Sequence, residues 1–155
     1  MMAADTRNIS SVELPNEVFL KEVCELIADG RDVTLRVRGV SMRPFLEDRR
    51  DMIVLTRLTE NAKVGDAVLA EIAPGKYVYH RIVKIEEGRV TLRGDGNAYG
   101  TELCGIENIK AATKQLIRKG HGYSPNGRAW RWYSALWPAN ALARRILLKL
   151  YRMFR

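Results

Sequence analysis

The sequence predicts a mainly β domain with one helix before it and one after it. Between residues 32 and 118 the apolar runs are short and turn signals are frequent, which is typical of strands. Apolar residues recur at helical spacing only outside this region. A chain of 155 residues fits one core with one or two appendages. We therefore divide it into an N-terminal segment (1–31), a β domain (32–120) and a tail (121–155).

The N-terminal segment predicts a helix over residues 15–29, which Gly30 ends. Four apolar residues fall on one helical face: Phe19, Val23, Leu26 and Ile27. We expect this helix to cap the sheet, and we assign it no chemistry.

The β domain predicts six strands. They are expected at residues 33–38, 51–59, 67–72, 77–85 and 89–93, and at the end of 106–117. Polar turns rich in glycine separate them, and the sequence contains no internal repeat.

A sharp corner follows the first strand at Gly39-Val40-Ser41-Met42-Arg43-Pro44. Glycine permits the turn and proline makes its exit rigid. A serine here could present its hydroxyl and its backbone N–H to one substrate carbonyl, as acyl transfer requires. The alternative is that these are turn residues without chemistry.

His80 lies in the middle of the fourth predicted strand, on the same face as Val78 and Ile82. Such a histidine can be a buried structural residue. It can also be the base that activates a serine, provided that the fold brings the two together.

Four short motifs occur in an order that resembles the signal peptidase I superfamily, which includes the LexA-type self-cleaving repressors. They are residues 39–44, Val64-Gly65-Asp66, His80-Arg81-Ile82-Val83 and Gly94-Asp95-Gly96-Asn97. The bacterial and LexA-type proteins have a lysine where this chain has His80. The chain is therefore similar to the archaeal and endoplasmic-reticulum type, which uses serine and histidine.

The resemblance implies a role for each matching residue. Ser41 would be the nucleophile and supply an oxyanion-hole N–H, and His80 would be the general base. Met42 would line the substrate pocket. Asp95 would orient His80 or hold its loop, and an Asx turn explains it equally well. The second acid of the endoplasmic-reticulum type falls here on Gly100-Thr101, which leaves the third position of a triad open.

The tail carries a concentrated positive charge. Seven of the 26 basic residues and none of the 18 acidic residues lie in 121–155. Its aromatic and basic candidates for contact with a membrane or partner are Trp130, Trp132, Trp137, Arg144, Arg145, Lys149 and Arg152. An apolar stripe accompanies them: Leu142, Ile146, Leu150 and Met153. This pattern favours an anionic membrane surface or a membrane-protein partner. Docking on the domain is the alternative. We do not expect nucleic acid, because it would leave the stripe unexplained.

These observations predict a serine endopeptidase that cleaves a peptide or leader through an acyl-enzyme, with a Ser41/His80 dyad and no cofactor or metal. Two cysteines without metal-ligand spacing fit a reducing compartment. No apolar stretch reaches the roughly 20 residues of a spanning helix. We therefore expect a cytoplasmic protein, peripheral on the inner membrane face. The alternatives are a catalytically inactive peptide-binding module on the same scaffold, and a membrane or partner adaptor that acts through the tail.

Overall fold

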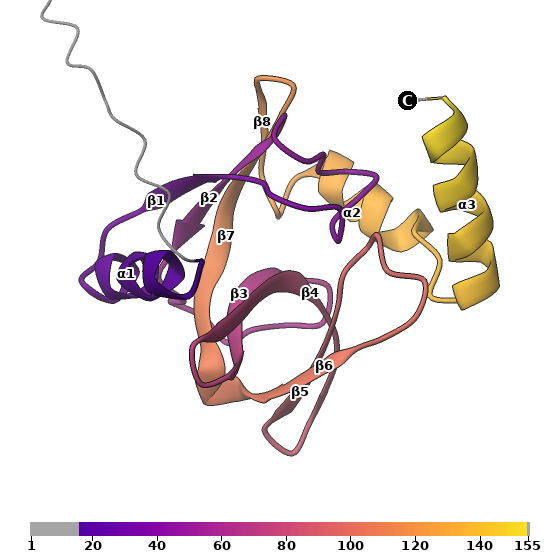
Figure 1. Cartoon of the computed structure of the whole chain (residues 1–155). Coiled ribbons are helices and arrows are strands. Elements are labelled where there is room, and N and C mark those ends of the chain that lie inside the picture. Colours follow the sequence, from indigo (N-terminus) through magenta and orange to yellow (C-terminus); the bar gives the residue numbers. More distant parts are fainter. Residues whose placement is uncertain (1–15, 155) are drawn as a thin grey trace, which may run out of the picture.

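A computed structural model describes residues 16–154 and confirms the mainly β class (Figure 1). The strands are β1 (Val33–Arg36), β2 (Met52–Thr56), β3 (Ala67–Ala73), β4 (Lys76–Glu86), β5 (Arg89–Arg93), β6 (Glu102–Gly105), β7 (Ile109–Arg118) and β8 (His121–Tyr123). The helices are α1 (Asn16–Ala28), α2 (Arg128–Leu136) and α3 (Ala141–Met153), with a single 3₁₀ turn, η1 (Ile106–Asn108). The polar N-terminus, Pro15 and Arg155 lie outside the described residues.

All the strands belong to one antiparallel sheet in the order β1-β2-β7-β3-β4-β5-β6, with β8 paired to β7. Its apolar side chains form two buried clusters. One includes Ile27, Leu55 and Leu116, and the other includes Ile82 and Leu92. The ends of the order leave β1 and β6 as edge strands, and both contribute to the site described below.

Helix α1 packs beside β1, β4 and β7, as its predicted capping role requires. Val23 and Ile27 are buried, whereas Phe19 and Leu26 are exposed at 40% and 37%. The face that packs on the core therefore also uses Leu20 and is rotated from the predicted one.

Three elements are absent from the sequence prediction: β6, β8 and α2. Strands β6 and β8 span four and three residues, and neither contains a run of apolar residues long enough to predict a strand. They form because a neighbouring strand offers backbone partners at its edge.

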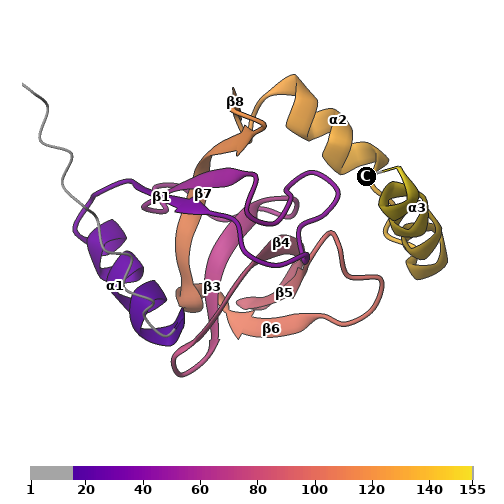
Figure 2. The ribbon, with the colours of Figure 1, turned by 45° about the horizontal axis from the view of Figure 1, so that its top comes forward.

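Helices α2 and α3 lie together on the side of the domain opposite α1 (Figures 1 and 2). Trp130 of α2 is buried and packs against Phe45 and Tyr133, with ring centroids 5.2 and 5.4 Å away. Helix α3 begins at an Asn140 cap and buries Leu148. The tail thus contributes to the core. From residue 16 to 154, no helix combines the length and hydropathy needed to cross a bilayer.

Candidate active site

The corner after β1 holds Ser41 in a defined position. Gly39 adopts a φ of +86°, which a side chain would strain, and its N–H donates to the Asp48 carboxylate at 2.8 Å. The N–H of Arg43 closes a turn onto the carbonyl of Val40 at 3.2 Å. Within residues 16–154, nothing accepts a hydrogen bond from the Ser41 N–H. That N–H is therefore available to a substrate oxyanion.

The loop at residues 94–97 packs directly on this corner. The Gly96 N–H donates to the Ser41 carbonyl at 2.7 Å. A Cβ on Gly94 would lie 2.4 Å from the Ser41 carbonyl oxygen, and one on Gly96 would lie 2.2 Å from that of Val40. Both distances are below any real carbon contact, so two glycines are required for the backbones to approach this closely.

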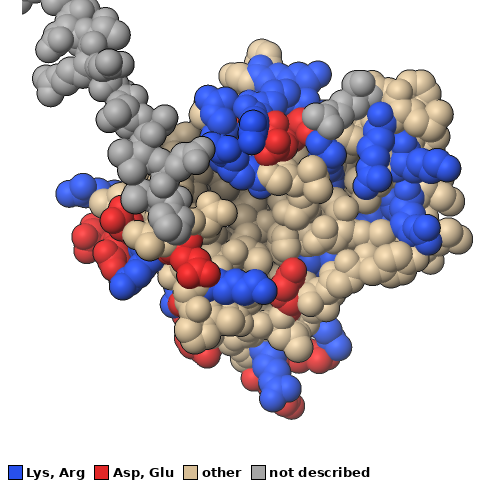
Figure 3. All heavy atoms as spheres, viewed as in Figure 1, with Lys and Arg blue, Asp and Glu red and all other residues tan. Residues whose placement is uncertain are grey.

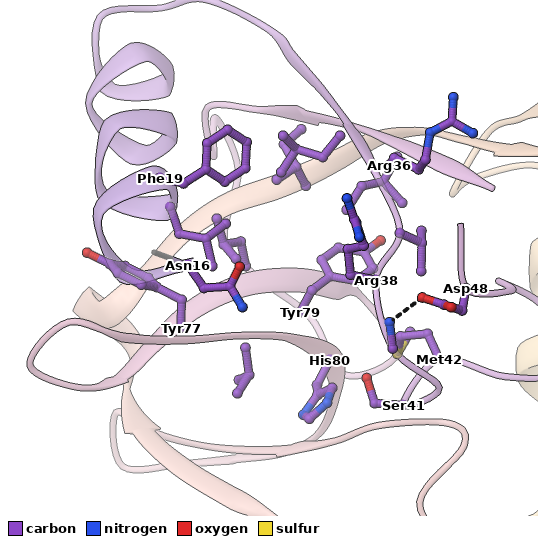
Figure 4. A pocket seen from close by; sticks show the side chains of 18 of the residues that line it. Asn16, Phe19, Arg36, Arg38, Ser41, Met42, Asp48, Tyr77, Tyr79 and His80 are labelled. Atoms are coloured by element: carbon purple, nitrogen blue, oxygen red, sulfur yellow. Dashed lines mark hydrogen bonds between the residues drawn. The ribbon is translucent and has the colours of Figure 1, made fainter. Parts of the chain in front are cut away.

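His80 faces the same point from β4. Its Nε2 lies 3.0 Å from the position that a Gly94 Cβ would occupy, beside the Ser41 carbonyl. Figure 4 shows the Ser41 hydroxyl next to the His80 ring, and both residues line one groove. No hydrogen bond joins the two side chains in the described part of the chain. Such bonds are often long in free enzymes and tighten when substrate binds.

Glu102, the first residue of β6, completes the arrangement. Its Oε2 lies 2.9 Å from His80 Nδ1. This contact favours a proton on Nδ1 and leaves Nε2, on the serine side, as the basic nitrogen. Glu102 follows Gly100-Thr101 directly, so the acid that contacts His80 lies one residue beyond the position left open by the sequence. An acidic residue at that spacing was the available signal, but the edge strand that directs it inward was not predicted.

Asp95 does not orient His80, so that interpretation is wrong. Its carboxylate is fully buried and accepts two hydrogen bonds from Arg81, at 2.8 and 2.7 Å. It also accepts one from the Tyr133 hydroxyl at 2.7 Å. Burial lowers the pKa of Arg81, but the bonds to Asp95 outweigh this and raise it. Asp95 therefore takes the other predicted role and holds its loop.

The tail helices support the loop at residues 94–97 and the Arg81 side chain. The Trp137 indole N–H donates to the Asp95 carbonyl at 3.1 Å, and Arg144 donates to the Gly94 carbonyl at 3.2 Å. The Arg81 guanidinium lies 4.4 Å from the centre of the Trp130 ring and donates to the Ser134 hydroxyl. Removal of the tail would therefore expose core and release the loop beside Ser41.

A second buried carboxylate, that of Asp51, holds the segment between the serine corner and β2. Asp51 accepts hydrogen bonds from the Arg50 side chain and from the N–H groups of Glu47 and Lys119. Burial raises the pKa of Asp51, but these bonds outweigh it and hold that pKa below its ordinary value. Tyr151 of α3 donates to Glu47 at 2.8 Å, which ties α3 to the same segment.

A groove of about 890 Å³ runs from α1 to Ser41 and His80. Two strand edges border it. The Val37 N–H donates to the Asp51 carbonyl, just before β2, so by alternation the neighbouring Arg36 directs its backbone groups to the free edge of β1. On the other side, residues 77–80 pair only with β3, because pairing with β5 begins at Arg81. An extended peptide could bond to either edge.

A family model described as Peptidase S24-like matches residues 2–116. The chain belongs to the Peptidase S24-like family. The superfamily resemblance read from the four motifs is thereby confirmed. The match includes the serine corner, His80 and Glu102, and ends in β7 before the tail. A search of the curated proteins finds no match.

This S24-like chain brings three of the predicted site residues together, because Ser41, Met42 and His80 line one groove. Met42 is buried, so the groove has an apolar wall beside the serine.

The predicted tail residues divide into two groups. Trp130 and Arg144 are buried and Trp137 is partly buried, so these three are packing residues and not surface contacts. The exposed members are Trp132, Arg145, Lys149 and Arg152.

Proposed function

We propose that this S24-like chain is a serine endopeptidase with a Ser41–His80–Glu102 triad. The observation that supports this most is the convergence at Gly94, where the Ser41 backbone and His80 Nε2 approach one point while Glu102 contacts the other ring nitrogen. A nucleophile, a base and a group that orients the base are the parts that acyl transfer needs.

In the proposed mechanism a peptide binds in the groove with its scissile carbonyl at Ser41. The hydroxyl oxygen bonds to the carbonyl carbon while His80 Nε2 takes the hydroxyl proton, and the Ser41 N–H stabilises the oxyanion. His80 gives that proton to the leaving amine as the C–N bond breaks. Water, deprotonated by His80, then cleaves the ester and restores the serine hydroxyl.

A fluorophosphonate probe tests this proposal. We expect the probe to label wild-type protein, with Ser41→Ala unlabelled and His80→Ala labelled far more slowly. Ser124→Ala, at an exposed serine outside the groove, is the matched control and should label normally. Equal labelling of wild type and Ser41→Ala would end the proposal.

The competing function is peptide binding without cleavage. The absence of a hydrogen bond between Ser41 and His80 favours it, because the base does not yet contact the hydroxyl. The same experiment separates the two functions. A binding module would retain peptides in its groove and remain unlabelled by the probe.

We further propose that the peptidase works at an anionic membrane surface. Large apolar side chains are exposed on α2 and α3: Trp132, Leu136, Leu142, Ile146, Leu147, Leu150, Met153 and Phe154. Exposed cations lie among them, and no acidic residue follows Glu107. Figure 3 shows basic and uncharged surface together over α3. Large apolar side chains gathered on an exposed surface mark a membrane or partner contact, and each cation near anionic lipid contributes about 1 kcal/mol.

Vesicle flotation tests this part. The full chain should float with vesicles that contain phosphatidylglycerol and not with phosphatidylcholine alone, and salt should weaken the binding. Ile146→Ser with Leu150→Ser should abolish flotation, whereas Leu103→Ser, at a more exposed leucine on β6, should not. Binding that ignores lipid charge, or survives the double substitution, contradicts a membrane role and leaves an adaptor for a protein partner. Point variants are needed because truncation before α2 would open the core.

A further inference from the structure

The groove that leads to Ser41 has one strongly charged rim. Three arginines line it on the side of β1 and the segment that joins β1 to β2: Arg36, Arg38 and Arg49. Figure 3 shows basic side chains gathered along the upper border of the central hollow. Asp48 is the acidic residue among the groove's described lining, and its carboxylate already accepts from the Gly39 N–H. The groove therefore carries an excess of positive charge.

Among these three arginines, Arg38 is the one best placed to bind a substrate side chain. Its side chain is exposed and makes no hydrogen bond or ion pair within residues 16–154. Arg36, by contrast, donates to the Arg49 carbonyl, and Arg49 lies 3.7 Å from Asp48. In Figure 4 Arg38 lies between Ser41 and the aromatic end of the groove at Phe19 and Tyr77. It is three residues before Ser41 and two residues after the end of β1, and it lines the groove.

The opposite wall has a different character. Tyr77, Val78 and Tyr79 of β4 and Phe19 of α1 contribute apolar and aromatic surface. A peptide lying between the two walls would place alternate side chains on opposite sides, as any extended strand does. One set would contact aromatic rings and the other would approach guanidinium groups. Guanidinium binds carboxylate with two parallel hydrogen bonds, which gives specificity as well as affinity.

We propose that the substrate is an extended acidic peptide, with an Asp or Glu near the scissile bond that pairs with Arg38 and apolar residues at the alternating positions. This inference rests on the proposed peptidase activity and names the substrate class of that same groove. Arg36 and Arg49 add to the positive potential without being the primary contact. The acidic residue would lie in the part of the peptide that runs from Ser41 toward α1.

The test is a cleavage profile. A synthetic library of degenerate peptides is incubated with full-length protein, and the cleaved bonds are identified by mass spectrometry. Wild type should cleave peptides with Asp or Glu at one position about fivefold faster than the same peptides with Asn or Gln. This ratio is the effect expected of one partly exposed ion pair. Arg38→Gln should remove this preference, and Arg38→Glu should replace it with a preference for Lys or Arg. Arg57→Glu, an exposed arginine outside the groove lining, is the control and should keep the wild-type profile.

The outcomes separate this inference from the activity on which it rests. A library left uncut by wild type would overturn the peptidase proposal itself. Cleavage without acidic preference, or a preference that Arg38→Glu leaves unchanged, would overturn the acidic substrate alone. Unfolding temperatures of the variants are measured in parallel. A lost preference with normal folding and normal cleavage of neutral peptides supports the role of Arg38.

Discussion

Glu102→Gln tests the least expected member of the site. The substitution keeps the size of the side chain and an oxygen that can accept from His80 Nδ1, but it removes the negative charge. In the proposed mechanism His80 becomes an imidazolium when it takes the serine proton, and the Glu102 carboxylate is the charge that would stabilise it. The variant should therefore bind peptide normally and react slowly.

The size of the effect follows from the contact. Nδ1 and Oε2 are 2.9 Å apart, which puts the two charge centres about 4 Å apart. At an effective dielectric constant of about 20, their attraction is about 4 kcal/mol. The Glu102 side chain is 26% exposed, so solvent screens part of this and about 2 kcal/mol remains. That corresponds to about a 30-fold loss in kcat.

The assay measures kcat and KM on one peptide taken from the library, with thermal unfolding alongside. Glu102→Gln should lower kcat with little change in KM or Tm, and Glu102→Ala should lower it further because the hydrogen bond is also lost. Glu107→Gln, an exposed carboxylate five residues later, is the matched control and should behave as wild type. A Glu102→Gln enzyme with wild-type kcat would show that His80 does not depend on this acid, and the triad would be refuted.

Three further predictions concern the structure around the site. Gly94→Ala and Gly96→Ala should each lower kcat/KM by about 100-fold, because a Cβ would displace the serine corner; activity within a few-fold of wild type would contradict the packing described. Asp95→Asn should lower the free energy of unfolding in urea by about 3 kcal/mol, because it leaves Arg81 buried without its partner charge; an unchanged urea midpoint would contradict this. The pKa of Asp51 is depressed on folding, so its contribution to stability is present above about pH 4 and is lost as pH falls through the folded-state pKa. Urea midpoints measured against pH should fall less steeply on the acid side in Asp51→Asn, and parallel curves would argue against the anchor.

Local patterns predicted the elements whose own residues specify them. Short apolar runs between turn signals located β1 to β5 but only the end of β7, and helical spacing located α1 and α3. The stripe of Leu142, Ile146, Leu150 and Met153 was predicted on one face, and it is exposed. Strands β6 and β8 and helix α2 were missed because partners outside these segments stabilise them.

The sequence by itself determined the serine corner, the histidine on the fourth strand and the ordered motifs that join them, because these depend on residue type and spacing along the chain. The tertiary structure decided which acidic side chain contacts His80 and which contacts Arg81. Glu102 contacts His80 because edge strand β6 pairs with β5, while Asp95 pairs with the Arg81 that follows the histidine. It also decided that Trp130 and Arg144 face inward. Their burial depends on surfaces contributed by distant segments, and no local pattern specifies those surfaces.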